Sequence, residues 1–84
     1  SLAYLGQCFS KRGMNDMAAR ALQNALDKKD VMDNEKMDLY YQLGCVLEAI
    51  GKKEESIEQF KQIYERDIDY RDVADRVDEY YMNL

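Results

Sequence analysis

Residues 40–66 read YYQLGCVLEAIGKKEESIEQFKQIYER, and this stretch decides the expected fold. Apolar and aromatic residues recur at spacings of three and four on both sides of Gly51, as they do on one face of a helix. Gly51 and the two lysines after it interrupt the pattern as a turn does. Glu54 near the start of the second segment and Arg66 at its end complement a helix dipole. The stretch therefore predicts two helices joined by a short turn.

Residues upstream of this stretch show the same helical spacing. Residues 2–12 predict a first helix with more than one apolar face, which Gly13 interrupts. Asn15-Asp16 then offers the N-cap of a second helix that fades near Lys28-Lys29. The polar run that follows predicts a loop, within which Asp33 or Asn34 caps the helix that precedes Gly51.

A last helix is expected after a short break at residues 67–69. Asp69 can cap it, and Asp72 stands three residues on, a spacing like that of a capping box. Its apolar residues form one stripe, and charged residues occupy the other side. We therefore expect one side to be buried and the other to be exposed to solvent. The expected fold is all-α, with five helices.

Composition limits the classes of protein that this chain can represent. It has 84 residues and a net charge of -5, which fits one small domain with little room for an enclosed catalytic cleft. The absence of Pro and the four Gly residues argue against collagen-like, linker-like and turn-dense all-β sequences. The absence of His removes the commonest general base and metal ligand. No stretch is long and apolar enough to predict a membrane span, and the start lacks a basic region before an apolar core.

The two cysteines, Cys8 and Cys45, show no metal-ligand spacing, so we expect no zinc or other metal site. They form either one disulfide or two buried or half-buried free thiols in a reducing compartment, and the second interpretation is the simpler one. We therefore expect a cytoplasmic location and no cofactor.

The chain repeats itself when it is shifted by 38 residues. Gly13 then aligns with Gly51, and the match continues through the helix that follows each glycine. An internal repeat of this length predicts stacked units, each unable to bury its apolar face alone. The first copy of the signature is Leu5, Gly6, Phe9, Gly13, Ala18, Leu22 and Ala25, and the second is Leu43, Gly44, Leu47, Gly51, Ser56, Phe60 and Ile63.

These residues resemble the tetratricopeptide repeat family, whose pattern has Leu-Gly, an aromatic three residues later, a Gly at the turn and small-large-small positions on the second helix. The resemblance covers about residues 2–66, and it implies two repeats and a C-terminal capping helix of a longer bacterial-type protein. The expected division is repeat one at about 2–30, a linker at about 30–34, repeat two at about 35–67 and the capping helix at about 69–83.

Three departures from the family pattern stand out. Asp30 and Ile68 occupy the positions of the Pro that ends each unit, and Ile63 stands where a small residue is usual. The period exceeds the usual 34 residues by four, and the additional residues fit the polar loop around 30–34. We expect a less rigid linker between the units and an altered docking of the last helix.

The glycines within helices support the match independently. Gly6 and Gly44 fall in the middle of predicted helices, where Gly costs about 1 kcal/mol relative to Ala. Close approach of the paired helix at Ala18 and Ser56 would offset this cost. Phe60 is expected to fill the gap between the two helices of its unit.

The resemblance implies a peptide-binding concave face, formed by the first helix of each unit. Its expected residues are Ala3, Gln7, Ser10 and Lys11 in the first unit and Asp38, Tyr41, Gln42, Cys45 and Glu48 in the second. Tyr41 is the best aromatic candidate, because a flat ring with a polar tip gives contact area at low entropy cost. Alternatively, Tyr41 packs on the last helix and touches no ligand.

The chemistry of this face bears on the ligand. Family members that capture the carboxylate tail of heat-shock chaperones use Lys, Asn and Arg here, whereas this chain has Ala3, Gln7, Gln42 and Cys45. We therefore expect no carboxylate clamp. Asp38 and Glu48 favour a neutral or basic peptide, although solvated charges on a helix explain them as well.

Two functions remain after the alternatives are weighed. Catalysis would need a nucleophile beside a base, a carboxylate pair in a pocket or a metal cluster, and the sequence indicates none of these. Nucleic-acid binding would need a basic stripe, whereas the Lys and Arg pairs are scattered in an acidic chain. The chain is expected to be a non-enzymatic module that binds a protein or peptide, or an element that assembles with itself as a homodimer or within a repeat protein. Packing of the Tyr80-Tyr81-Met82 end against a second copy of the chain would suit the second function.

Overall fold

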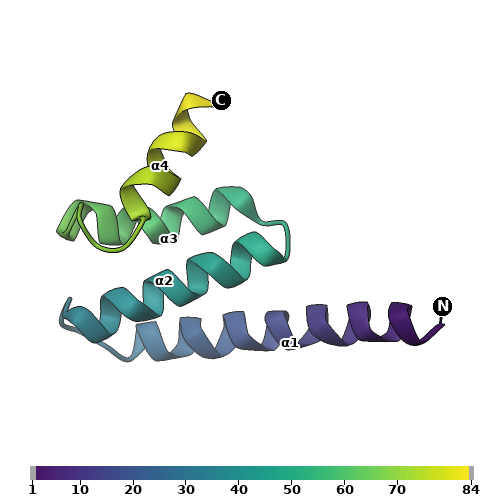
Figure 1. Cartoon of the computed structure of the whole chain (residues 1–84). Helices are drawn as coiled ribbons and strands as arrows, with labels where there is room; N and C mark the ends of the chain where they lie inside the picture. The colour runs from purple at the N-terminus through teal and green to yellow at the C-terminus, as the bar shows by residue number, and fades with distance from the viewer. Residues whose placement is uncertain (1, 84) are drawn as a thin grey trace.

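The computed structural model describes the backbone of residues 2–83 and the side chains of residues 13–83. Four helices follow one another along this part of the chain: α1 (Leu2–Asp27), α2 (Asn34–Ala49), α3 (Lys53–Arg66) and α4 (Val73–Met82). Consecutive helices α1, α2 and α3 lie antiparallel and side by side, and α4 leaves α3 at a steep angle (Figure 1). The prediction of an all-α fold is confirmed for the described residues.

The helices form a thin layer rather than a closed bundle. Each helix packs closely on its neighbour in the sequence, α1 on α2, α2 on α3 and α3 on α4. The molecule measures 44 × 33 × 17 Å along its principal axes. Within the described residues, helices that are not consecutive in the sequence do not pack on one another. Most helices therefore keep a surface that faces solvent on one or both sides of the layer.

The hairpin of α2 and α3 begins and ends as its sequence predicts. The Asp33 carboxylate accepts a hydrogen bond from the backbone N–H of Lys36 at 2.8 Å, so Asp33 is the N-cap of α2. Gly51 adopts a φ of 85°, and its N–H donates to the carbonyl of Glu48 at 3.1 Å. The N–H of Lys52 donates to the carbonyl of Leu47 at 2.9 Å. This pattern is a Schellman motif, which ends α2 and reverses the chain.

The two helices of this hairpin meet at Gly44. A Cβ atom at Gly44 would lie 2.7 Å from the Phe60 ring, so only glycine allows the helices to approach this closely. The Ser56 hydroxyl donates to the Gly44 carbonyl at 2.6 Å, and Ser56 is fully buried. Phe60 is likewise fully buried and fills the gap between α2 and α3. The predicted close approach at Gly44 and the predicted role of Phe60 are confirmed.

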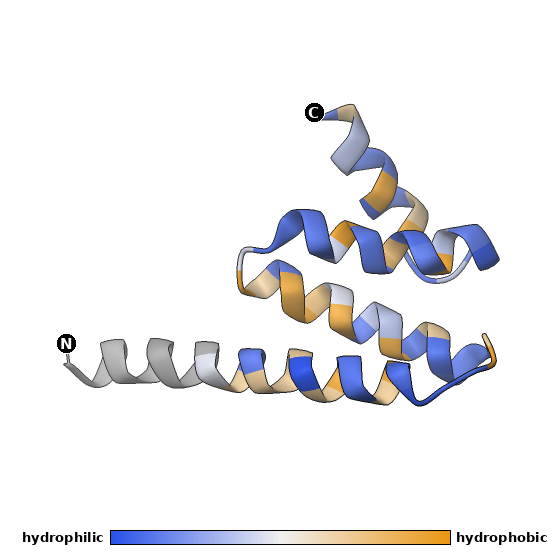
Figure 2. Ribbon diagram, turned by 180° about the vertical axis from the view of Figure 1, so that it is seen from behind, coloured by the Kyte–Doolittle hydropathy of each residue, from blue (hydrophilic) through white to orange (hydrophobic). Residues whose placement is uncertain are grey.

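Two apolar clusters hold the layer together. Leu26 of α1 is buried with Leu43 and Leu47 of α2, and Ala19 and Leu22 pack against them. The larger cluster joins α2, α3 and α4 through Met37, Ile57, Phe60, Ile63, Val73 and Val77. Figure 2 shows hydrophobic residues where α2 faces its neighbours and hydrophilic residues along the outer side of α3.

The expected number of five helices is wrong for the described residues, because the predicted turn at Gly13 does not form. α1 runs without interruption through Gly13, and the predicted N-cap at Asn15-Asp16 lies inside this 26-residue helix. Gly13 does not have a positive φ, and nothing lies within 4 Å of the position that its Cβ would occupy. A single Gly inside a helix costs only about 1 kcal/mol, and Ala, Met, Arg and Leu around it favour helix. The first sequence copy is therefore not a helical hairpin.

The last helix also begins later than predicted. α4 starts at Val73, and its N-cap residue Asp72 makes no side-chain capping bond. The Asp72 carboxylate instead accepts hydrogen bonds from Tyr41 and Arg76. Asp69, the predicted cap, donates its backbone N–H to the carboxylate of Asp67 within the turn. Asp72 is thus engaged by Tyr41 of α2 and Arg76 of α4 rather than in the predicted capping box.

Candidate functional site

Tyr41, the predicted aromatic contact for a ligand, lies between α2 and the segment that leads into α4. Its hydroxyl donates to the Asp72 carboxylate at 2.7 Å. Its ring meets the rings of Phe60 and Tyr70 edge-on, with centroids 5.5 and 6.2 Å apart. Of the two alternatives for Tyr41, the structure supports packing within the chain, because the side chain is half-buried and belongs to the larger apolar cluster.

Two arginines stack on this aromatic group. The Arg71 guanidinium carbon lies 4.8 Å from the centroid of the Tyr41 ring, and that of Arg76 lies 5.0 Å from the centroid of Phe60. Such cation–π contacts contribute about 0.5–2 kcal/mol, more when they are shielded from water. Arg71 has a φ of 44°, a backbone conformation that L-residues seldom adopt. The turn before α4 therefore holds Arg71 over the ring at the expense of local backbone strain.

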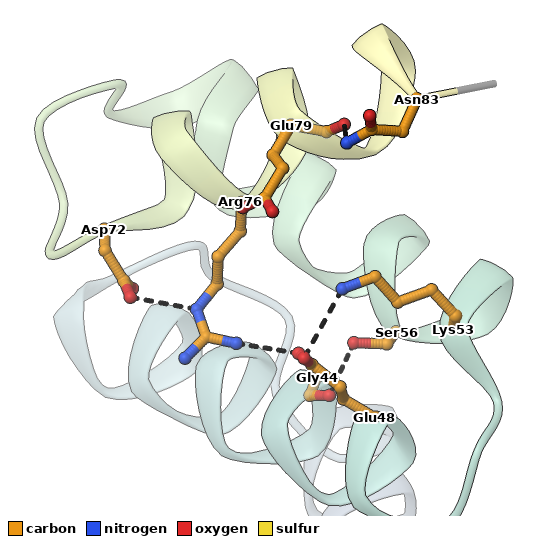
Figure 3. A network of polar contacts seen from close by, with 8 residues as sticks. All are labelled: Gly44, Glu48, Lys53, Ser56, Asp72, Arg76, Glu79 and Asn83. Carbon is orange, nitrogen blue, oxygen red and sulfur yellow. Dashed lines mark hydrogen bonds and ion pairs between the residues drawn. The ribbon is translucent and has the colours of Figure 1, made fainter.

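The carboxylates expected to attract a basic peptide are paired inside the chain. Asp38 lies 3.2 Å from the Arg71 guanidinium and accepts a hydrogen bond from Gln42 at 2.8 Å. Glu48 pairs with Arg76 at 2.8 Å and with Lys53 at 3.4 Å (Figure 3). These contacts fasten the start of α4 to α2. Both charges are thus already neutralised by neighbours, and the face offers less to a basic peptide than the sequence indicated.

The hydrogen bond between Tyr41 and Asp72 shifts both groups. It raises the pKa of the Tyr41 hydroxyl, and partial burial adds to the effect. The same hydrogen bond lowers the pKa of the Asp72 carboxyl, and the Arg76 guanidinium lowers it further. Both shifts favour a neutral phenol that donates to a charged carboxylate.

Cys45 carries a free, half-buried thiol, as one of the two alternatives for the cysteines predicts. Burial raises the pKa of this thiol, so the reactive thiolate is disfavoured at neutral pH. Cys8 lies outside the residues whose side chains are described. Within the described part of the chain, no cluster of three or more His, Cys, Asp or Glu side chains has metal-binding geometry.

The rest of the predicted concave face divides into two parts. Gln42 is exposed on the open side of α2. The residues expected from the first helix lie outside the described side chains, as do three members of the first signature copy. These are Ala3, Gln7, Ser10 and Lys11 of the face and Leu5, Gly6 and Phe9 of the signature. The structure brings together Asp38, Tyr41, Cys45 and Glu48, but it does so around the beginning of α4.

A groove that the sequence did not indicate lies between α3 and α4. It has a volume of about 390 Å³, and its lining residues are Lys61, Tyr64, Glu65, Val77, Asp78 and Tyr81. The periodicity of α3 and α4 places Tyr64, Val77 and Tyr81 on their apolar stripes. Only the crossing angle of the two helices decides that this part of the stripes remains open to solvent. A second groove of about 300 Å³ lies beside α2, between α1 and α3.

None of the described helices has the length and apolar character needed to cross a membrane. In the comparisons with known proteins, no family model matches the chain, and neither a curated protein nor a solved structure matches it. The resemblance to tetratricopeptide repeats therefore depends on the residues of the two signature copies alone.

Proposed function

We propose that this chain is a non-enzymatic protein-interaction module that binds a peptide or helix of a partner protein. In this proposal α2 and α3 form one repeat of the tetratricopeptide type, α1 packs on that repeat as a single long helix, and α4 is the capping helix. The support is the Gly44 contact, where Ser56 and Phe60 of α3 pack on a glycine of α2 at the positions that the family pattern requires. A cytoplasmic location belongs to the same proposal.

The observation that carries this proposal is the thin layer of helices. A layer 17 Å thick presents a large surface for its size. Stacked helical units commonly use such extended surfaces to bind other chains. Two open places on the layer suit a partner segment: the exposed side of α2 around Gln42 and the groove between α3 and α4.

The experiment is affinity capture from a lysate with the whole chain and two surface variants. Gln42→Arg changes the open side of α2, and Tyr81→Ser removes an aromatic wall of the groove. Both residues are exposed, so both variants are expected to fold like the original chain, as circular dichroism would verify. We expect at least one variant to lose a captured partner that Asp30→Lys, an exposed loop control, retains. Equal recovery by all variants would contradict binding at either place.

Self-association is the second candidate, and exposed methionines on α1 favour it. Met14 is 66% exposed and Met17 is 69% exposed, one helical turn apart. Large apolar side chains grouped on a surface are typical of contacts with another chain. Light scattering over a range of concentrations separates the candidates, because a monomer throughout favours partner binding and a concentration-dependent dimer favours self-association.

A further inference from the structure

The groove between α3 and α4 combines an apolar floor with acidic rims. Tyr64 of α3 and Val77 of α4 lie along it, and Tyr81 forms one wall. Glu65 lines it from the α3 side and Asp78 from the α4 side. A groove with this cross-section matches an amphipathic segment that has apolar residues along its centre and cations on its flanks.

The two rim carboxylates differ from those on α2. Asp38 and Glu48 both pair with arginines of the same chain. Within the described residues, Glu65 and Asp78 take part in no ion pair, and both are exposed. Lys61, the one cation that lines the groove, lies 3.5 Å from Glu58 and is engaged there. The groove therefore presents unpaired negative charge from both of its sides.

The tyrosine wall is also suited to cations. The ammonium of Lys61 lies 5.5 Å from the centroid of the Tyr81 ring, so this ring already has a cation near it. Tyr81 is 46% exposed, and Tyr80 meets it edge-on with centroids 5.3 Å apart. A Lys or Arg of a partner that reaches Tyr81 would gain a cation–π contact in addition to the attraction of Asp78.

The internal repeat shows that two residues of the groove are more exposed than the residues aligned with them. Thirty-eight residues before Tyr64 and Tyr81 stand Leu26 and Leu43, which are buried between α1 and α2. α3 lies along the other side of α2 and does not reach α1 (Figure 1), and the second groove, which Leu43 lines, stays open between them. Met82, in the last turn of α4, is 84% exposed. Tyr64 and Tyr81 are thus less buried than their counterparts Leu26 and Leu43, and the apolar stripe of a partner helix would cover them.

We infer that the groove between α3 and α4 binds a basic amphipathic helix of a partner protein, with its apolar stripe on Tyr64, Val77 and Tyr81 and its cations beside Glu65 and Asp78. This inference rests on the proposed function and names the chemistry of the partner. The attraction between opposite charges steers the partner to the groove, and the aromatic contact holds it there.

The test uses fluorescence anisotropy with labelled synthetic helices. One peptide carries a Leu stripe flanked by Lys, and a second carries the same stripe flanked by Glu. We expect the Lys peptide to bind the whole chain at least about tenfold more tightly than the Glu peptide, and more weakly as salt is added. Equal binding of the two peptides, or no binding of the Lys peptide, would overturn the inference.

Variants locate the binding. Tyr81→Ser and Asp78→Lys are each expected to lower the affinity for the Lys peptide by about tenfold or more. Asp30→Lys makes the same charge change on the loop between α1 and α2. It is expected to change the affinity for the Lys peptide by less than about twofold, after correction for net charge. Equal losses for Asp78→Lys and Asp30→Lys would show that only net charge matters, and this would overturn the inference.

The outcome for the proposed function is read separately. If the Lys peptide fails to bind but Gln42→Arg still loses a captured partner, the chain remains an interaction module and only the groove is excluded. If the Lys peptide fails to bind and neither Gln42→Arg nor Tyr81→Ser loses a captured partner, both proposals fail.

Discussion

The two copies of the sequence repeat adopt different structures. In the second copy Gly51 turns the chain, and α2 and α3 pack face to face. In the first copy the aligned Gly13 stays helical, and residues 2–27 form one rod. The comparison shows that a glycine permits a turn but does not impose one, because the turn must be held by the contacts that it makes possible.

The residues that would hold each hairpin explain the difference. Phe60, Ile63 and Ser56 of the second copy are fully buried against α2. Their counterparts in the first copy are Leu22, Ala25 and Ala18, which together offer less apolar surface to bury. Alanine is also the residue that most favours helix, so the first copy gains from remaining straight. Met14 and Met17 stay exposed on the rod as a consequence.

The largest expected effect tests the packing of the second copy. We expect Phe60→Ala to lower the free energy of unfolding by about 3–5 kcal/mol, because it empties the space between α2 and α3. Leu22→Ala, the aligned change in α1, should cost only about 1–2 kcal/mol because Leu22 is half-buried. Denaturation in urea measures both. Equal decreases in the free energy of unfolding would mean that the two copies are packed alike, and this would contradict the structure.

The next effect concerns the contact at Gly44. Gly44→Leu adds a side chain whose Cβ would lie only 2.7 Å from the Phe60 ring. Phe60 is fully buried and has no room to move aside. We expect a loss of about 1–3 kcal/mol through overpacking. Chemical denaturation with guanidinium would reveal it. An unchanged midpoint would show that α2 and α3 can move apart at Gly44 without a loss of stability. The close contact at Gly44 would then not be what stabilises the hairpin.

A second pair of variants compares the two aligned glycines directly. Gly51→Ala should destabilise the chain by about 1–2 kcal/mol, because alanine is strained at a φ of 85°. Gly13→Ala should stabilise it by about 0.5–1 kcal/mol, because Gly13 is helical and a Cβ there meets no other atom within 4 Å. Thermal unfolding of dilute samples gives both signs. A loss of stability in Gly13→Ala would indicate a turn in the first copy and reverse the comparison.

The smallest effect concerns the fastening of α4 to α2, a contact without a counterpart in the described part of the first copy. The pKa of Asp72 is lowered in the folded chain, so its contribution to stability is fully present above the ordinary value of 3.8 and is lost as the pH falls through the folded value. We expect Asp72→Asn to lower stability modestly at pH 7 and to reduce the loss between pH 7 and pH 3. Urea midpoints at the two pH values measure this, and identical pH dependence in the two chains would exclude the Asp72 contacts.

Much of the second half of the fold could be predicted from local patterns. The N-cap at Asp33, the turn at Gly51 and the close approach at Gly44 each depend on a residue type whose backbone or size requirement is local. The start of α4 could not be predicted in this way. Asp72 has the right spacing for a capping box, but Tyr41, which is 31 residues away in the sequence, takes its carboxylate.

The candidate site was predictable only in part for the same reason. The sequence placed Asp38, Tyr41, Cys45 and Glu48 on one face of one helix, and they do lie on one face. It could not show that Arg71 and Arg76 would lie over that face, because their positions depend on where the chain turns after α3. The groove beside Tyr81 was not anticipated, since its opening depends on the angle between α3 and α4.

The sequence alone determined that the described chain is helical, where α2 and α3 begin and end, and which residues meet at Gly44, because helix periodicity, capping and glycine geometry act over a few residues. Tertiary structure alone decided whether the chain would turn at Gly13, which residues cover the α2 face that carries Asp38 and Glu48, and that the apolar stripe beside Tyr81 stays open to solvent. Those outcomes are set by differences in buried surface and by contacts between residues far apart in the chain, which no local pattern contains.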